Sequence, residues 1–154
     1  MGKSLESSKG SVWALFLTTH AVVLEAIESR LSAAGLPALT WYDVLWALER
    51  GKDERARMHE LAEKTVLSRS NLTRLIDRLE DARLVKRERA ENDRRGAFAV
   101  LTSEGKAMRK KMWPVYERCI EAYFEAQVSA SEAQTLAAVL QRIQGAAQAG
   151  HEVN

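Results

Sequence analysis

The hydrophobic positions between Ser68 and Leu84 recur with the period of an α-helix. Their spacing places four of them on one face of that helix: Leu72, Leu75, Ile76 and Leu79. Ser68 stands just before the first turn, where its hydroxyl can accept a hydrogen bond from an unpaired backbone N–H. The pattern therefore predicts a helix that is capped by Ser68 and packs through this apolar face.

The opposite face of the predicted helix carries side chains of the kinds that contact nucleic acid. It holds basic, hydroxyl and amide groups: Arg69, Ser70, Asn71, Thr73, Arg74 and Arg78. The first turn contains no acidic residue, so the positive end of the helix dipole and Arg69 can attract an anion there. Taken alone, the segment fits a DNA recognition helix and an amphipathic surface helix with a solvated basic face equally well.

The first part of the chain predicts a long helix over residues 11–34. Its apolar positions, from Val12 to Leu31, follow a helical period, and Gly35 and Pro37 supply the usual stop. The apolar stripe is wide for the first helix of so small a chain. We therefore expect this helix to pack on something besides its own DNA-binding part.

Two further helices are predicted before the recognition helix. One begins at Thr40, which forms a capping-box pair with Asp43, and ends at Gly51. Residues 52–56 predict a charged loop, and residues 58–65 predict a short helix. A short helix, a tight turn and a longer helix with a polar face make a helix-turn-helix unit.

After the recognition helix the pattern changes to the period of a β-strand. Residues 85–90 predict a strand with a mainly charged exposed face, residues 91–96 a charged turn, and residues 97–101 the returning strand. Arg94 and Arg95 fall at the tip of this hairpin. A hairpin with a basic tip directly after a recognition helix is the arrangement of a winged helix.

Two long helices complete the predicted fold. Thr102 caps the first, and Pro114 lies inside it, where we expect a kink rather than a break. Ser129 and Glu132 form a capping box at the start of the second, which is expected to end at one of the two glycines of the last stretch. Like the first helix, these two carry more apolar surface than a small winged domain can cover.

Composition is that of an ordinary globular protein, with 154 residues of which 46% are hydrophobic and 29% charged. The net charge of +2 does not by itself indicate a nucleic-acid partner. The distribution is more informative, because the stretch from Arg50 to Arg95 holds 14 Lys and Arg against 10 Asp and Glu. The basic excess therefore lies around the candidate recognition helix.

The single cysteine, Cys119, excludes an internal disulfide and fits a reducing, cytoplasmic compartment. It falls on an apolar helical stripe, which predicts a buried, inert thiol. The apolar stretch 12–17 is soon interrupted by polar residues, so neither a signal peptide nor a membrane-spanning run is expected. The three histidines are scattered without clustered carboxylates or thiols, and neither a metal nor a cofactor is predicted.

The order of these elements resembles the MarR family of bacterial transcriptional regulators, over roughly residues 12–144. The resemblance rests on five stretches: LTWYDVL (39–45), MHELAEKT (58–65), SRSNLTRLIDRLE (68–80), LVKRERAENDRR (84–95) and LTSEG (101–105). The sequence NDRR followed by LTSEG is the most specific part. The implied fold is mainly α with a small β-hairpin wing.

The resemblance implies a single domain, 1–154, in which residues 38–102 form a winged helix-turn-helix. Residues 11–34 and 103–148 would be dimerisation helices, which interlock with those of a second copy. Two winged parts would then contact a pseudo-palindromic operator in double-stranded DNA, with their recognition helices about 34 Å apart.

The residues expected to contact DNA follow from the family pattern and from their chemistry. On the recognition helix they are Ser68, Arg69, Ser70, Asn71, Thr73 and Arg74. Arg94 and Arg95 resemble the wing arginines that the family places in or beside the minor groove. Asp93 is expected to pair with an arginine and so shape the wing.

A cleft between the dimerisation and DNA-binding parts binds small, often phenolic or aromatic, carboxylates in many family members. In this sequence the residues expected to line such an effector pocket are Trp13, Phe16, His20, Trp46, Met112 and Trp113. Ordinary packing in the core and in the dimer interface explains the same residues without any ligand.

Together with these residues, the resemblance implies a cytoplasmic, homodimeric DNA-binding regulator, most often a repressor, that a small aromatic or phenolic effector releases from its operator. The alternative is an effector-independent winged-helix module for architectural DNA binding or protein contact. An enzyme is not expected, because no nucleophile–base pair, phosphate-binding loop or metal cluster is evident.

Overall fold

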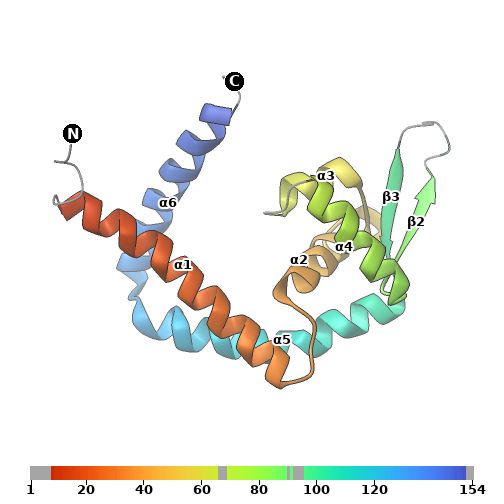
Figure 1. Cartoon of the computed structure of the whole chain (residues 1–154), viewed down its shortest axis with the longest axis horizontal. Coiled ribbons are helices and arrows are strands. Elements are labelled where there is room, and N and C mark those ends of the chain that lie inside the picture. The colour runs from red at the N-terminus through yellow and green to blue at the C-terminus, as the bar shows by residue number, and fades with distance from the viewer. Residues whose placement is uncertain (1–7, 66–68, 90, 92–95, 152–154) are drawn as a thin grey trace. The chain divides into compact units, whose positions relative to one another are not determined.

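The computed structural model describes residues 8–65, 69–89, 91 and 96–151, and it confirms a mainly helical chain with a small sheet (Figure 1). The helices are α1 (Ser8–Ala33), α2 (Leu39–Glu49), α3 (Met58–Lys64), α4 (Arg69–Asp81), α5 (Ser103–Tyr123) and α6 (Ala130–His151). The strands are β1 (Arg55–Arg57), β2 (Val85–Arg89) and β3 (Ala97–Leu101), and short 3-10 turns occur at η1 (Lys52–Glu54) and η2 (Glu125–Gln127).

The contacts within the chain divide it into two units, Met1–Tyr116 and Glu117–Asn154. Helix α5 begins in the first unit and ends in the second, which also contains α6. The helix-turn-helix and the three strands lie entirely within the first unit.

The sheet has three antiparallel strands in the order β1-β3-β2. The hairpin strands β2 and β3 were predicted. In the observed register Arg87 of β2 pairs with Ala99 of β3. Strand β1 corrects the prediction of a loop over residues 52–56, since Ala56 pairs with Ala99 from the other side. A strand of three residues is too short to show an alternating pattern, and it forms because β3 offers it an unpaired edge.

The hydrophobic core of the first unit lies between the helix-turn-helix and the sheet. All four apolar residues expected on the inner face of α4 are buried: Leu72, Leu75, Ile76 and Leu79. They pack in one cluster with residues of α2, α3 and the sheet, namely Val44, Leu45, Leu48, Ala56, Leu61, Leu84, Val85, Ala99 and Leu101. This packing fixes which face of α4 turns away from the core.

The start of α2 differs from the prediction of a capping box at Thr40. The helix begins one residue earlier, at Leu39, and Ala38 at its N-cap makes no side-chain hydrogen bond. The backbone N–H of Leu39 instead donates to the carboxylate of Glu28 on α1, at 2.9 Å. The cap thus comes from another helix, and Thr40 is already inside the first turn.

The turn between α4 and β2 ends the recognition helix with two backbone hydrogen bonds. The N–H of Leu84 donates to the carbonyl of Leu79 and the N–H of Arg83 to that of Glu80, both at 2.9 Å. Arg83 takes a left-handed conformation with φ of 62°, as the residue after a helix often does.

The cap predicted at Thr102 is confirmed, because its hydroxyl accepts a hydrogen bond from the N–H of Gly105 at 3.0 Å. The same hydroxyl donates to the carbonyl of Arg83 at 2.8 Å. A Cβ atom at Gly105 would lie 2.1 Å from the carbonyl oxygen of Leu84, so the close approach of α5 to this turn requires glycine.

The ends of the last two helices agree with the sequence only in part. Helix α5 continues through Pro114 without a break, as predicted. The capping box of α6 is present, with Ser129 N–H donating to Glu132 at 2.8 Å. Helix α6 was expected to stop at Gly145 or Gly150 but runs to His151, because glycine permits a helix end without imposing one.

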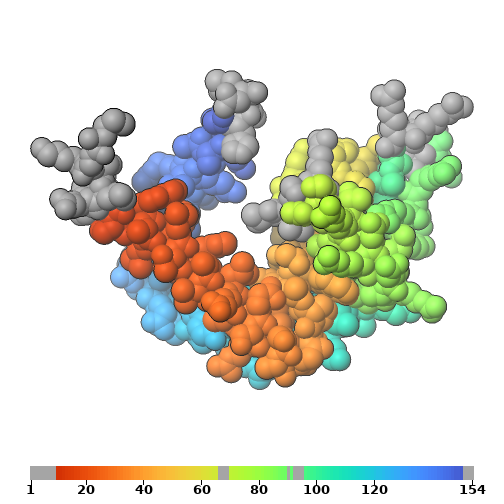
Figure 2. Space-filling model, viewed as in Figure 1, coloured from red at the N-terminus to blue at the C-terminus, as the bar shows by residue number. Residues whose placement is uncertain are grey.

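Helix α1 exposes large apolar side chains along its first two thirds, among them Val12, Trp13, Leu15, Leu17 and Val22. Figure 2 shows this helix, from red to orange, open to solvent on the face in view. Its stretch Gly10–Ala33 is long and apolar enough to cross a membrane by length and composition, contrary to our expectation. The three polar residues at positions 18–20 are too few to offset the apolar residues around them.

Candidate nucleic-acid interface

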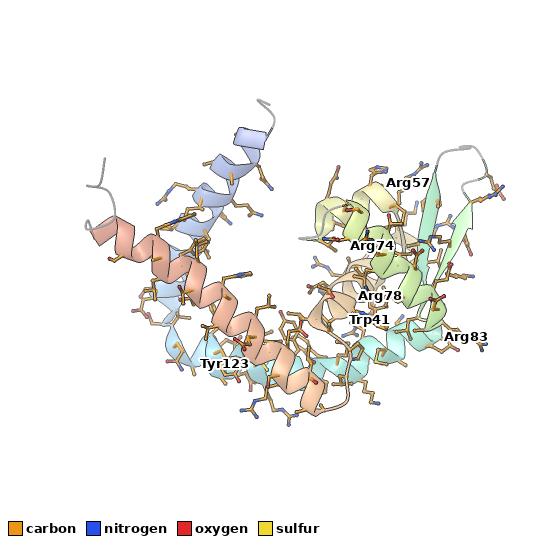
Figure 3. All side chains as sticks on the ribbon, viewed as in Figure 1. Trp41, Arg57, Arg74, Arg78, Arg83 and Tyr123 are labelled. Atoms are coloured by element: carbon orange, nitrogen blue, oxygen red, sulfur yellow. The ribbon has the colours of Figure 1, made fainter. Side chains whose placement is uncertain are left out.

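On the face of α4 opposite the core, the residues that the structure describes expose polar side chains. Ser70, Asn71, Thr73 and Arg74 are all exposed there. Figure 3 shows Arg74 and Arg78 along α4 and Arg83 at its C-terminal end. Ser68 and the side chain of Arg69 lie outside the described residues. This face combines hydrogen-bond donors and acceptors with positive charge, which suits both base edges and phosphates.

The hairpin strands β2 and β3 follow α4 directly, so the recognition helix and the wing belong to one compact part. The three residues expected to act at the wing tip, Asp93, Arg94 and Arg95, lie outside the described residues. Lys86 on β2 is exposed and pairs with Glu88 at 3.0 Å. It thus lies on the strand face that points away from α4.

Arg87, between those two residues, turns to the opposite face of β2 and contacts the recognition helix. Its backbone N–H donates to Glu80 at 2.9 Å, and its guanidinium donates to Glu80 at 3.1 Å and to Asp77 at 2.5 Å. Partial burial disfavours the charge, but the two carboxylates outweigh that effect and raise the pKa of Arg87. Sequence reading assigned Arg87 only to a charged strand and missed these partners.

Two further arginines were missed because β1 was not predicted. Arg55 and Arg57 lie on the outer face of the sheet, with guanidinium carbons 4.6 Å and 5.1 Å from the ring centre of Phe98. Arg55 also pairs with Glu88 on β2 at 3.2 Å. Cation–π contacts of this kind hold a basic surface in place beside the wing.

The residues expected to line an effector pocket are only partly brought together. Trp13 and Phe16 contact each other on exposed α1, with ring centres 6.1 Å apart. Met112 is fully buried. Trp113 lies beside buried Tyr42, also with ring centres 6.1 Å apart. His20 is exposed on α1.

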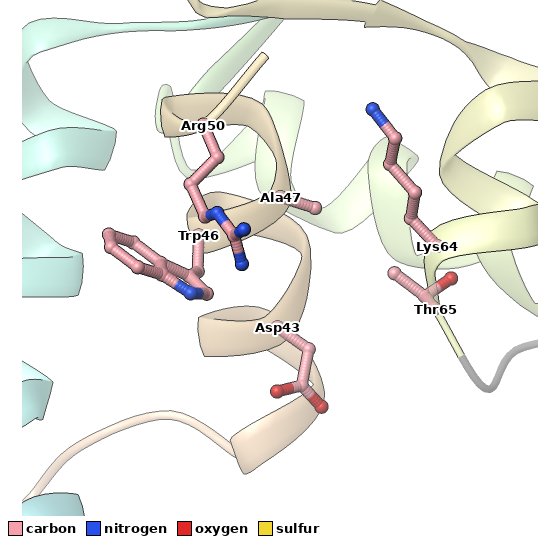
Figure 4. A pocket seen from close by; sticks show the side chains of 6 residues that line it. All are labelled: Asp43, Trp46, Ala47, Arg50, Lys64 and Thr65. Carbon is pink, nitrogen blue, oxygen red and sulfur yellow. The ribbon is translucent and has the colours of Figure 1, made fainter. Parts of the chain in front are cut away.

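Trp46, the sixth of those residues, lines an open cavity of about 470 Å³ within the first unit. Asp43, Trp46 and Ala47 of α2 form one side with Arg50 at the C-cap of that helix, and Lys64 and Thr65 at the end of α3 form the other (Figure 4). The ring is flanked by cations, since guanidinium carbons of Arg50 and Arg109 lie 5.7 Å and 5.0 Å from its centre. Aromatic surface and positive charge thus meet at this opening.

The burial predicted for the single cysteine is confirmed. Cys119 is buried, as its place on an apolar stripe indicates. Within the described ranges, no group of three or more His, Cys, Asp or Glu side chains is arranged to hold a metal ion.

Comparison with known proteins identifies the family to which the chain is similar. Residues 34–96 match the model of the MarR family. The HTH-type transcriptional regulator SarZ of Staphylococcus aureus is 35% identical over 94 residues, which cover 61% of this chain. The chain spans about 60% of the length of this curated relative.

Two solved structures from Streptomyces coelicolor are similar over nearly the whole chain. AbsC, a MarR family transcriptional regulator, matches with a TM-score of 0.88 and 30% identity, covering 96% of this chain and 99% of AbsC. Sco3205, a family member crystallised in complex with DNA, has the same fold, with a TM-score of 0.84, 23% identity and 90% coverage of each chain. From the family model, the likeness to AbsC and the winged helix-turn-helix, we conclude that the chain belongs to the MarR family.

Proposed function

We propose that this protein is a sequence-specific DNA-binding transcriptional regulator. The observation that carries the proposal is α4, which buries its apolar face in the core beside a β-hairpin and exposes Ser70, Asn71, Thr73 and Arg74. A helix presented in this way fits the major groove, and an adjoining hairpin reaches the neighbouring backbone or minor groove.

Each proposed contact follows from side-chain chemistry. Arg74 is suited to a guanine edge and Asn71 to an adenine edge, because both can form paired hydrogen bonds in the major groove. Ser68, Arg69, Ser70 and Thr73 supply further donors for phosphates and bases. Arg94 and Arg95 are proposed for the minor groove, where a narrow A·T-rich stretch concentrates negative potential, and Asp93 for shaping the wing.

The protein is proposed to act as a homodimer on a pseudo-palindromic operator. The large apolar side chains on α1 support this, because exposed apolar surface of that extent marks an interaction site. A second copy would cover the helix and set two recognition helices about one turn of DNA apart, roughly 34 Å. The same surface would otherwise fit a membrane, so the oligomeric state is a direct test.

We propose further that the bound dimer represses transcription in the cytoplasm and that a small aromatic or phenolic effector releases it. The cavity beside Trp46 supports an effector of this class, since Arg50 and Lys64 can bind an acidic group while the indole contacts a ring. A ligand there would lie next to the end of α3, which leads into the recognition helix.

Selection from a randomised duplex library tests the DNA-binding proposal. We expect enrichment of an inverted repeat, a shifted complex that forms at nanomolar protein, and a dimer on a sizing column. A monomer that enriches no sequence and retains no duplex at low salt would refute the proposal. If a DNA sequence is enriched but no aromatic acid from a broad panel releases the protein from it, the effector-independent alternative is favoured.

Tryptophan emission tests the effector itself. We expect phenolic or aromatic acids to quench or shift the emission and to release the selected duplex at the same concentrations. The Trp46→Phe variant should lose the part of the signal that arises at the cavity. Release of DNA with an unchanged Trp46 signal would place the effector elsewhere.

A further inference from the structure

The contacts between Arg87 and α4 join the two elements that the proposed function assigns to DNA. Glu80 accepts hydrogen bonds from both the backbone and the side chain of Arg87, and Asp77 accepts one from its guanidinium. Asp77 and Glu80 are three residues apart on a helix and therefore share a face. One residue of the wing is thus held at three points by the recognition helix.

The position of β2 in the sheet makes these contacts important. With the strand order β1-β3-β2, β2 is an edge strand that pairs only with β3. The N–H of Arg87 donates to Glu80, so the recognition helix covers part of the outer edge of β2. A two-stranded hairpin is marginally stable by itself, and beyond the reach of β1 the wing has only two strands. Its orientation therefore depends on what holds that edge.

Direct contact of Arg87 with DNA is a weaker explanation of the same geometry. Its guanidinium is already engaged with two carboxylates, and only 29% of its side chain is exposed. The cluster of one cation and two anions carries a net negative charge, which phosphates repel. A role in positioning the wing explains why Asp77 and Glu80 stand on a surface that is proposed to bind DNA.

We infer that Arg87, Asp77 and Glu80 form a clamp that fixes the orientation of the wing relative to the recognition helix, so that both contact the same operator half-site. The inference rests on the proposed function. Arg87 acts as a positioning residue here, because it works through the wing and not through its own contact with DNA.

The sign of one substitution separates the clamp from simple electrostatics. Glu80→Ala removes a negative charge near DNA, which alone would tighten binding. The clamp predicts the opposite, a loss of about tenfold in affinity for the selected duplex. It also predicts a shallower dependence of affinity on salt, by roughly 0.9 in the logarithmic slope for each phosphate that the wing no longer neutralises.

Glu88→Ala is the matched control. Glu88 is also a half-exposed carboxylate in an ion pair with an arginine, Arg55, but that pair lies on the far face of the sheet and does not involve α4. The Glu88→Ala substitution removes the same charge as Glu80→Ala, and we expect it to leave binding to the selected duplex unchanged or tighter. Arg87→Lys keeps the charge but loses the paired geometry, and it should weaken binding as Glu80→Ala does.

A second measurement does not require DNA. In the Glu80→Ala protein, amide hydrogen exchange should accelerate over β2 and β3 while the core face of α4 keeps its protection. Exchange unchanged from the wild type, or DNA binding as tight as that of Glu88→Ala, would overturn the clamp. If the wild type selects no duplex, the regulatory proposal fails, and the exchange data still decide whether the clamp holds the wing.

Discussion

The carboxylate of Glu28 on α1 accepts a hydrogen bond from the backbone N–H of Leu39, the first residue of α2, at 2.9 Å. The first four N–H groups of a helix have no partner within it, and a side chain that accepts from one of them stabilises that helix. Here the acceptor comes from the preceding helix. The bond therefore also ties α1 to the helix-turn-helix part of the same unit.

Replacing Glu28 should destabilise the protein through this cap. We expect Glu28→Ala to lower the free energy of unfolding by about 1 kcal/mol, the usual effect of losing an N-cap. Chemical denaturation measures it, with Glu25→Ala, an exposed position on the same helix, as the control. Equal losses in the two variants would show that the bond contributes nothing specific.

Asp43 should make stability depend on pH in the acid range. Burial and the charge of Glu28 raise the pKa of its carboxyl above the ordinary value of 3.8. The folded state therefore disfavours the ionised form, so the contribution of Asp43 to stability is greatest below 3.8 and is lost as pH rises through the folded pKa. Asp43→Asn should stabilise the protein at neutral pH.

Melting curves of both proteins across the acid range test that sign. The advantage of Asp43→Asn should shrink as the pH falls and vanish where the wild-type carboxyl is protonated in both states. The burial is incomplete and the side chain still faces solvent, which screens its charge, so the effect should be small. An advantage that grows toward low pH would contradict the argument.

Replacing Arg83 by glycine should stabilise the folded protein, because a φ of 62° is unfavourable for a residue with a Cβ atom. We expect Arg83→Gly to raise the free energy of unfolding by roughly 0.5–1 kcal/mol. Arg83→Ala is the control, since alanine meets the same steric cost as arginine and should not stabilise. Thermal unfolding of the two variants separates the backbone effect from the loss of the charge.

Gly105 should tolerate no side chain. An added Cβ would lie 2.1 Å from the carbonyl oxygen of Leu84, and that backbone must shift to admit it. We expect Gly105→Ala to destabilise the protein by roughly 1–3 kcal/mol. Gly145→Ala on α6 meets nothing within 4 Å and should instead be neutral or stabilising, as alanine is in helices.

Loss of a proposed reading arginine should weaken DNA binding. Arg74→Ala and Arg94→Ala are each expected to reduce operator affinity by more than about 1 kcal/mol at near-physiological salt. Arg74→Ala should also relax the base preference at one position, whereas Arg94→Ala should act mainly at A·T-rich flanks. Lys110→Ala, at an exposed position on α5, removes the same charge and should have little effect. Unchanged affinity in Arg94→Ala would remove the wing from the mechanism.

Local patterns in the sequence predicted the helices and their inner faces. The apolar face of α4, the caps at Thr102 and Ser129, and the passage of α5 through Pro114 all depend on residues within a few positions of each other. Such signals are contained in short stretches of chain, so periodicity and capping chemistry suffice to find them.

The features that were missed depend on residues brought together by folding. Strand β1 exists because it meets β3, some 40 residues later in the chain, and α2 is capped by a residue of α1. The partners of Arg87 follow from the register of β2 and from the turn after α4, neither of which a single sequence specifies. The exposure of Ser70, Asn71, Thr73 and Arg74 agrees with the proposed interface, and their contacts with DNA stay a prediction.

Pro114 has a mechanical consequence for the long helix that contains it. A proline has no N–H to donate to the carbonyl four residues earlier, so the hydrogen-bond ladder of α5 lacks a rung at Lys110. The contacts of the chain divide between Tyr116 and Glu117, within one turn of that gap. A helix bends most readily where its hydrogen-bond ladder is interrupted, so we expect α5 to bend most easily around Pro114.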